Sequence, residues 1–297
     1  MLWILHCTSF LFKLCTTCDW DVKNGKEDFC SKVDLNSWFV LAVRNLYSER
    51  RSSSCVPPFQ RVNGEYKIAH VYRLLACTIQ KNFSTTLTAI IFCKERNEYS
   101  SLAGVSREFN LSAWTMIAVI RDPLERFVSG FADKCLRRKE WEGYPQRCCG
   151  CKTNLTCFME KLYDKMMLGT FEDYVGDFDA EHFFPQSWRC EFNFHLSQYH
   201  ILKFDTFKAA EFIRDLAATL KKQNVPESFI AYIVEESVLC GHLNHTTRGT
   251  VEQEETRRSI LSSRYLMDLL IKMFYYDFVL FGFPLPIENV SSICPQL

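Results

Sequence analysis

Ile68–Arg96 reads IAHVYRLLACTIQKNFSTTLTAIIFCKER, and its alternation of apolar and polar segments predicts a strand, a loop and a helix in that order. The apolar, β-branched run Ile68–Ile79 is typical of a buried strand. The polar loop Gln80–Thr86 follows, and the apolar segment Leu87–Phe92 suits a buried helix. Because the first backbone N–H groups of a helix have no partner within it, this order of elements favours an anion site at the helix start.

The loop side chains favour the same kind of ligand. Ser84, Thr85 and Thr86 can cap the helix and donate hydroxyl hydrogen bonds, and Lys81 adds a mobile positive charge. A phosphate or sulfate ester would suit this loop. The G-x-x-x-x-G-K-[ST] pattern of nucleoside-triphosphate loops is missing, and an ordinary strand–turn–helix with a solvated lysine remains an alternative for this stretch taken alone.

A second stretch, WTMIAVIRDPLERFVSGF at residues 114–131, repeats the pattern. Thr115–Ile120 predicts a buried strand, and Pro123 stands where the first turn of a helix accepts proline. Arg121 leaves the strand with a five-donor guanidinium that suits a phosphate dianion, and Ser129 can hydrogen-bond the same group. A plain strand-to-helix turn with a local ion pair is the structural alternative.

Together the two stretches resemble sulfotransferases that use PAPS (3′-phosphoadenosine 5′-phosphosulfate). Arg121–Phe131 looks like their R-D-P-x-x-R-x-x-S-x-[FY] motif, and Lys81–Thr86 resembles their 5′-phosphosulfate loop, with Gln80 where the family often has proline. The resemblance implies that the first motif binds the 3′-phosphate through Arg121 and Ser129. It implies that the loop binds the 5′-phosphosulfate through Lys81, Ser84, Thr85 and Thr86.

The similarity extends to Golgi carbohydrate sulfotransferases of the chondroitin/dermatan 4-O and HNK-1 type. Three later segments resemble theirs in the family's order: Glu181–Gln186 followed by Cys190, Thr246–Thr250, and Tyr275–Phe283. Within the second, Arg248 resembles a late-loop residue that closes over the nucleotide. The resemblance implies an α/β, P-loop-like fold with a central parallel sheet flanked by helices.

Sulfuryl transfer, like phosphoryl transfer, requires in-line positioning and stabilisation of charge on the leaving oxygen. Lys81 and the loop N–H groups suit that role, while a histidine would take the proton of the accepting sugar hydroxyl. His182 is the candidate base because, of the seven histidines, only it falls in a family-like segment. A structural, hydrogen-bonded His182 is the alternative, and His195 and His70 are the runners-up. The scheme requires no divalent metal.

The balance of charge limits the partners. Lys+Arg and Asp+Glu both number 35, so the formal net charge is zero and no global field attracts nucleic acid or a membrane surface. With 47% hydrophobic residues the chain can build a core. Its 297 residues suit one large domain or two small ones, and the resemblance favours a single lumenal domain over residues 19–297.

Residues 1–18 are expected to be a signal peptide or a short signal-anchor. The apolar run LWILHCTSFLF at residues 2–12 is shorter than the ~20 residues that a spanning helix needs. It fits the core of a signal peptide, although a positive N-terminal region is missing. A short anchor, an incomplete N-terminus and a buried helix are the other interpretations.

Cysteines and sequons indicate a secretory route. The 15 cysteines favour an oxidising lumen, and the Cys-rich segment 135–157 is expected to be a disulfide-stapled insertion, because no Cys or His pairs match zinc spacing. The sequons begin at Asn110, Asn154, Asn244 and Asn289. Asn82 also fits the pattern, but a glycan there would block the anion loop, so we expect it to stay bare.

The sequence thus predicts a carbohydrate sulfotransferase of the Golgi lumen, anchored or secreted, that moves a sulfuryl group from PAPS to a glycan hydroxyl. The expected acceptor is a chondroitin/dermatan-like GalNAc 4-hydroxyl. An inactive secreted glycan-binding protein with the same fold is the alternative. A P-loop kinase is disfavoured by the missing glycines and by the Arg121 motif.

Among the later elements, Thr256–Tyr276 predicts one long amphipathic helix.

Overall fold

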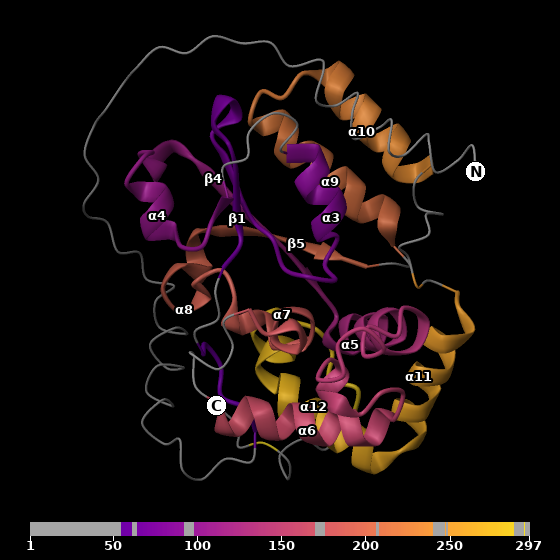
Figure 1. Cartoon of the computed structure of the whole chain (residues 1–297). Coiled ribbons are helices and arrows are strands. Elements are labelled where there is room, and N and C mark those ends of the chain that lie inside the picture. Colours follow the sequence, from indigo (N-terminus) through magenta and orange to yellow (C-terminus); the bar gives the residue numbers. More distant parts are fainter. Residues whose placement is uncertain are drawn as a thin grey trace. The chain divides into compact units, whose positions relative to one another are not determined.

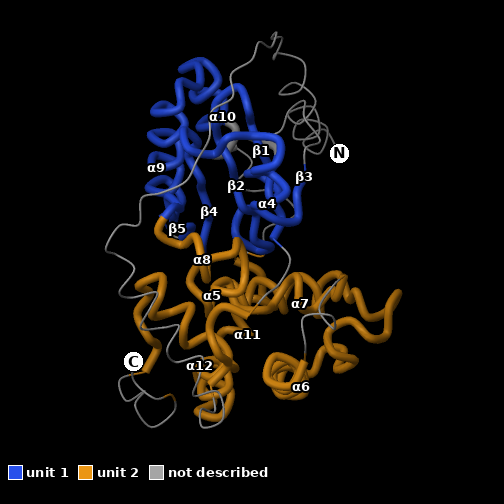
Figure 2. Tube along the Cα trace, turned by 90° about the vertical axis from the view of Figure 1, so that its left-hand side faces the viewer, with its two compact units in different colours: residues 1–33, 63–120, 198–246 blue, residues 34–62, 121–197, 247–297 orange. Residues whose placement is uncertain are grey.

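The computed structural model describes residues 55–60, 64–91, 98–169, 176–205, 208–239, 247, 249–287 and 294. The chain divides into two compact units, coloured in Figure 2. Unit 1 comprises residues 1–33, 63–120 and 198–246, and unit 2 comprises residues 34–62, 121–197 and 247–297. The single domain over residues 19–297 stays a prediction, and the segment 1–18 lies outside the described residues.

Unit 1 is built on a five-stranded sheet of order β3-β1-β2-β4-β5. The strands are β1 Tyr66–Ala69, β2 Leu74–Cys77, β3 Glu98–Tyr99, β4 Thr115–Arg121 and β5 Tyr199–Phe204. Strands β2 and β4 are parallel, whereas β1 runs antiparallel to both β2 and β3. The α/β class with flanking helices is confirmed. The sheet is mixed rather than wholly parallel, but the β2–β4 pair, which precedes both predicted anion loops, has the expected direction.

The prediction of one continuous strand over Ile68–Ile79 is wrong. The run forms β1, a 3-10 turn η2 at His70–Tyr72, and β2, which pairs back on β1. Arg73 makes the reversal in the left-handed region, with φ 49°. Because the turn contains no Gly, Pro or Asn, the apolar pattern gave no sign that the chain folds back here.

Helices pack on one face of this sheet. They are α3 Ser84–Ile91, α9 Ala209–Lys222 and α10 Glu227–Leu239; α4 Leu102–Ser106 and the 3-10 turn η3 Leu111–Ala113 belong to the same unit. Alternate residues of β2 and β4 point to one side and pack with Leu87 of α3 and with Phe212 and Leu216 of α9. Figure 1 shows α9 and α10 side by side along the sheet. The predicted helix after the loop is confirmed as α3.

Unit 2 is helical in its described part. Its α-helices are α5 Pro123–Phe131, α6 Leu155–Leu168, α7 Phe178–Phe183, α8 Phe192–His195, α11 Val251–Ser262 and α12 Arg264–Leu280. The π-helix η4 Ala132–Arg137 continues α5, and 3-10 turns lie at η5 Cys148–Gly150, η7 Gln186–Trp188 and η8 Leu196–Gln198. Buried phenylalanines hold these helices together: Phe158 of α6 lies 4.7 Å from Phe183 of α7 and 6.0 Å from Phe127 of α5, between ring centroids.

The long helix predicted over Thr256–Tyr276 is interrupted. Ser263 is extended, with φ −111° and ψ 112°, and its Oγ accepts a hydrogen bond from the N–H of Leu266 at 3.3 Å. The serine therefore caps a new helix, α12, instead of continuing α11.

Disulfides staple the Cys-rich segment, as predicted. Cys135 pairs with Cys148, and Cys151 pairs with Cys157. A third bridge, Cys55–Cys294, joins positions 239 residues apart. Cys77 and Cys190 are also disulfide-bonded. Within the described residues no helix is both long enough and apolar enough to span a membrane.

Candidate functional site

The loop after β2 is fixed to the neighbouring strand. Asn82 is 1% exposed, and its Nδ2 donates to the carbonyl oxygen of Val119 in β4 at 2.9 Å. On either side of it, Lys81 and Phe83 have φ of 70° and 63°. Left-handed backbone at such residues costs about 1–3 kcal/mol each and persists only where the surroundings impose it. The loop therefore has a defined, strained shape at the carboxyl end of β4.

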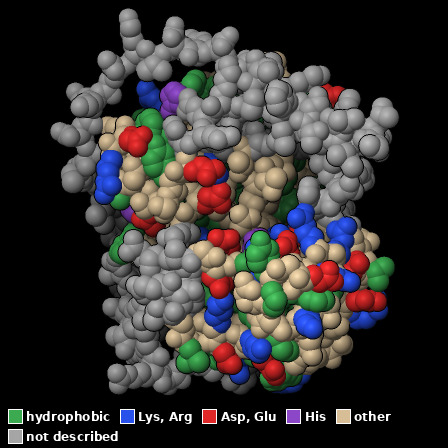
Figure 3. Space-filling model, viewed as in Figure 1, with side chains coloured by type: hydrophobic (Ala, Val, Ile, Leu, Met, Phe, Trp, Pro, Cys, Tyr) green, Lys and Arg blue, Asp and Glu red, His purple; other side chains and the backbone are tan. Residues whose placement is uncertain are grey.

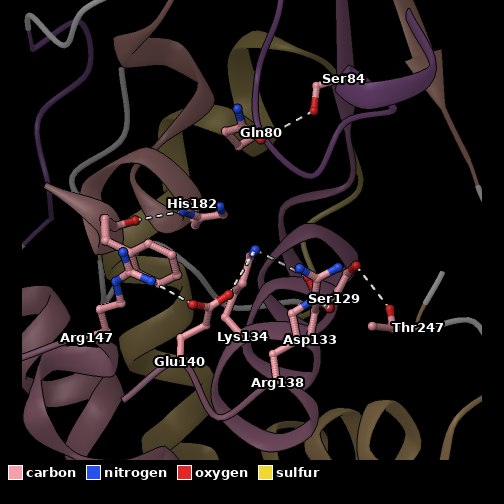
Figure 4. Close-up of polar contacts among 11 residues, drawn as sticks. Gln80, Ser84, Ser129, Asp133, Lys134, Arg138, Glu140, Arg147, His182 and Thr247 are labelled. Atoms are coloured by element: carbon pink, nitrogen blue, oxygen red, sulfur yellow. Dashed lines mark hydrogen bonds and ion pairs between the residues drawn. The ribbon is translucent and has the colours of Figure 1, made fainter. Parts of the chain in front are cut away.

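The start of α3 gathers the polar side chains of this loop. Ser84 is its first residue, followed by Thr85, which is exposed, and Thr86. Ser84 Oγ donates to Gln80 Oε1 at 3.4 Å, as Figure 4 shows, and Gln80 Nε2 donates to Glu65 at 3.4 Å. Gln80 thus links the loop to the segment before β1, at the position where the resemblance led us to expect proline. The donor-binding roles of these residues stay predictions.

The second predicted motif lies in unit 2. Arg121 ends β4 and is 5% exposed. Asp122 caps α5 by accepting from the N–H of Glu125 at 3.0 Å, and Pro123 occupies the first turn, as predicted. Ser129 is buried on α5. The motif therefore lies in a short turn between strand and helix, closed by a side-chain cap.

The late loop reaches this motif. Thr247 Oγ1 donates to Ser129 Oγ at 3.1 Å, with both side chains buried (Figure 4). Thr250 caps α11 and donates to the carbonyl of Thr247 at 2.8 Å. Arg248, between them in sequence, lies outside the described residues. The sequence had singled out this loop for its arginine, and its threonine makes the contact that the structure records.

Buried arginines lie within and beside the motif. Arg126 of α5 is 2% exposed and donates from Nη1 to the carbonyl of Phe184 at 2.9 Å. Burial lowers its pKa to about 9; the positive charges of Arg189 and Arg121 act in the same direction, and the carboxylate of Asp277 opposes them. The charges of Arg121 and Arg189 thus both act on Arg126, and guanidinium groups gathered in this way suit a phosphate dianion. Sequence reasoning missed Arg189, although it lies one residue before the Cys190 of a family-like segment.

His182 lies on α7 with its tautomer defined by a backbone contact. Its Nδ1 is 2.8 Å from the carbonyl oxygen of Phe178 (Figure 4). A carbonyl can only accept, so Nδ1 carries hydrogen and Nε2 is the acceptor nitrogen of the neutral ring. A general base needs that form. Helix α7 is held in turn by Asp179, whose carboxylate accepts from the N–H groups of Cys148 and Cys149, each at 2.9 Å.

Cationic side chains flank the Phe178 ring beside His182. Lys134 Nζ lies 5.6 Å and the Arg147 guanidinium 4.2 Å from its centroid. Glu140 lies 2.6 Å from Arg147 and 3.7 Å from Lys134, so the two cations share one carboxylate (Figure 4). To bind an acceptor, the two cations would have to give up their ion pairs with Glu140. These contacts alone are explained as a structural network.

The runner-up histidines are placed differently. His70 stands in the η2 turn of unit 1 and stacks on Phe109 at 6.5 Å, and His195 ends α8 in unit 2. Among the described residues, no group of three or more His, Cys, Asp or Glu side chains is arranged to hold a metal. Acidic and basic side chains are interspersed over the described part of the face in Figure 3, in keeping with the zero net charge.

Comparison with known proteins shows the family of the chain. The sequence profile of the sulfotransferase family matches residues 64–284. A carbohydrate sulfotransferase of Caenorhabditis elegans, chst-1, is 32% identical over 262 residues, which cover 77% of this chain and 78% of that protein. A putative sulfotransferase, vep-2, of the same organism is 30% identical over 71% of this chain and 73% of its own length. An uncharacterised C. elegans protein is 28% identical over 78% and 72%. No significant match was found among solved structures. On its sequence match and its α/β fold, the chain belongs to the sulfotransferase family.

Proposed function

We propose that this protein is a carbohydrate sulfotransferase that moves a sulfuryl group from PAPS to a glycan hydroxyl. The observation that carries the proposal is the buried arginine cluster around Arg121, which opens the R-D-P-x-x-R-x-x-S motif. The planar, multi-donor guanidinium suits a dianion such as the 3′-phosphate of PAPS. The family generally uses this donor, and one relative is named a carbohydrate sulfotransferase.

The residues present fit such a donor. The planar guanidinium of Arg121 and the hydroxyl of Ser129 would bind the 3′-phosphate, and Arg248 would close the late loop over the nucleotide. The loop around Lys81 has a strained, left-handed backbone and leads into the start of α3, where the first N–H groups of the helix lie. With Ser84, Thr85 and Thr86 it would bind the 5′-phosphosulfate.

When bound, PAPS supplies the activated sulfuryl group. Lys81 and the neighbouring N–H groups would stabilise charge on the 5′ side, and loss of one such donor costs about 10²–10³ in rate. His182 would accept the proton of the sugar hydroxyl at Nε2, while the Phe178 carbonyl keeps hydrogen on Nδ1. Arg121 and Ser129 bind and orient without taking part in bond making.

We further propose a chondroitin/dermatan-like GalNAc 4-hydroxyl as the acceptor and the Golgi lumen as the location. The disulfides of residues 135–157 support an oxidising compartment, because such bonds persist there and are rare in the cytosol. A segment within residues 1–18 would serve as signal or anchor.

Transfer of ³⁵S from labelled PAPS to a glycan panel tests the proposal. We expect incorporation into chondroitin or dermatan, and its loss in Lys81→Ala and Arg121→Ala variants that melt like the wild type. Lys221→Ala and Arg264→Ala are matched controls, because both remove highly exposed cations of surface ion pairs. If the wild-type protein binds glycans but labels none of them, the protein is an inactive binding protein and the proposal fails.

A further inference from the structure

The side-chain amide of Gln186 makes two hydrogen bonds to the backbone of Arg121. The N–H of Arg121 donates to Gln186 Oε1 at 2.9 Å, and Gln186 Nε2 donates to the carbonyl of Arg121 at 2.8 Å. Gln186 is fully buried and lies 65 residues further along the chain. One side-chain amide thus satisfies both polar backbone groups of the last residue of β4, as a neighbouring strand would.

Asp277 of α12 holds Gln186 in this position. Its carboxylate accepts from the backbone N–H of Gln186 at 2.7 Å and of Ser187 at 2.8 Å, and Gln186 Nε2 lies 3.4 Å from Asp277 Oδ2. Asp277 is 1% exposed. The carboxylate therefore accepts hydrogen bonds from the first N–H groups of the η7 turn. It also contacts the Gln186 amide that is hydrogen-bonded to Arg121.

The charge of Asp277 has a second consequence. Its carboxylate acts on Arg126, where it opposes the two neighbouring arginines. Burial raises the pKa of Asp277, while the hydrogen bonds from Ser187 and Gln186 and the charge of Arg126 counteract that rise. A buried carboxylate is expensive, and a well-packed apolar residue of the same volume is often as stable or more so. A role beyond stability would explain this choice of residue.

The geometry points to Gln186 and Asp277 as positioning residues that fix the backbone of Arg121 and so determine affinity for the 3′-phosphate of the donor. This inference rests on the proposed function, in which Arg121 binds that phosphate. The hydrogen bonds of a guanidinium group are directional, so the group selects a phosphate best when the backbone that carries its side chain is fixed. Neither residue touches the nucleotide, and both act through Arg121.

The test compares two nucleotides by isothermal titration calorimetry on the whole chain. Adenosine 3′,5′-bisphosphate carries the 3′-phosphate and 5′-AMP lacks it. In Gln186→Leu and Asp277→Asn we expect the Kd of the bisphosphate to rise about tenfold or more, and that of 5′-AMP to change by less than about threefold. The selectivity for the 3′-phosphate should fall accordingly.

Two further variants separate positioning from general loosening. Trp188→Phe is the control on the same turn. It loses the 2.8 Å hydrogen bond from Nε1 to the Pro57 carbonyl but leaves the two hydrogen bonds between Gln186 and Arg121 intact. It should melt earlier with unchanged selectivity. In an Arg121→Ala background, Gln186→Leu should have no additional effect on bisphosphate binding, because its target is gone.

Equal weakening of both nucleotides, unchanged selectivity, or full additivity with Arg121→Ala would overturn the inference. If Gln186→Leu does not fold, Gln186→Met and Asp277→Asn carry the same comparison, since methionine keeps the length of the side chain and removes both hydrogen bonds to Arg121. A wild-type protein without preference for the bisphosphate over 5′-AMP would instead refute the proposed function, so the two failures are distinguishable.

Discussion

Asn82 offers a direct test of how the loop after β2 is held. Its amide is 1% exposed and donates to the Val119 carbonyl at 2.9 Å, across 37 residues of sequence. Replacing it with alanine removes this buried hydrogen bond, whose net contribution to the unfolding free energy is about 0.5–1.5 kcal/mol. The left-handed backbone at Lys81 and Phe83 loses its support at the same time. We therefore expect Asn82→Ala to destabilise the protein by that amount and to raise the donor KM.

Asn82→Asp sharpens the test because it keeps the shape and removes the donor. Burial would raise the pKa of the new carboxyl above its usual value of about 3.9. The destabilisation is therefore small near pH 4, where a protonated carboxyl can still donate, and grows as the pH rises toward 7 and the ionised form becomes buried. Asn82→Ala should show no such pH dependence.

Urea denaturation of both variants at pH 4 and pH 7 measures these differences. Ser84→Ala is the matched control, since it abolishes the same sequon yet keeps the Asn82 amide; its 3.4 Å contact with Gln80 is weak and should cost about 1 kcal/mol or less. Wild-type stability in Asn82→Ala and Asn82→Asp at both pH values would refute the reasoning, as would a glycan on Asn82 in the folded protein.

Three further predictions follow from individual contacts. A Cβ on Gly130 would lie 2.7 Å from the ring of Phe183, so Gly130→Ala should destabilise the fold by about 1–3 kcal/mol through overpacking, offset by at most about 1 kcal/mol of helix propensity. Gly143→Ala is the control, because a Cβ there has nothing within 4 Å and should leave the melting temperature unchanged. Equal effects of the two substitutions would contradict this packing. His182→Ala should lower kcat about 10²–10⁴-fold while nucleotide affinity stays the same, and full turnover would exclude it as the base. Asn154 is exposed and caps α6 through Oδ1, which leaves its amide nitrogen available for a glycan; glycopeptide mass spectrometry of the protein from a secretory host should find one there, and a bare Asn154 would count against the secretory route.

Local patterns predicted the parts of the fold that local chemistry determines. The β4 strand and Pro123 in the first turn of α5 follow from short-range preferences for burial and fixed φ. The disulfide-stapled insertion followed from cysteine spacing and compartment. The reversal at Arg73 and the break at Ser263 did not, because a left-handed arginine and a helix-capping serine look like ordinary residues in an apolar or amphipathic run.

Contacts between distant segments were beyond the reach of sequence reasoning. Gln186 and Asp277 both fell in family-like segments, yet their hydrogen bonds join positions 91 residues apart, and only the folded chain brings them together. The Thr247–Ser129 contact spans 118 residues in the same way. Motif resemblance could point to the segments, whereas the residues that position the motif had to be read from the structure.

The central proposal is that binding of the donor nucleotide requires both Lys81 and Arg121. Titration of adenosine 3′,5′-bisphosphate and 5′-AMP into wild type, Lys81→Ala and Arg121→Ala tests it most directly. We predict that Arg121→Ala abolishes the preference for the bisphosphate while affinity for 5′-AMP persists, and that Lys81→Ala weakens both nucleotides about equally. Wild-type affinity for both nucleotides in either variant, or a bisphosphate preference that survives the loss of Arg121, would contradict the claim.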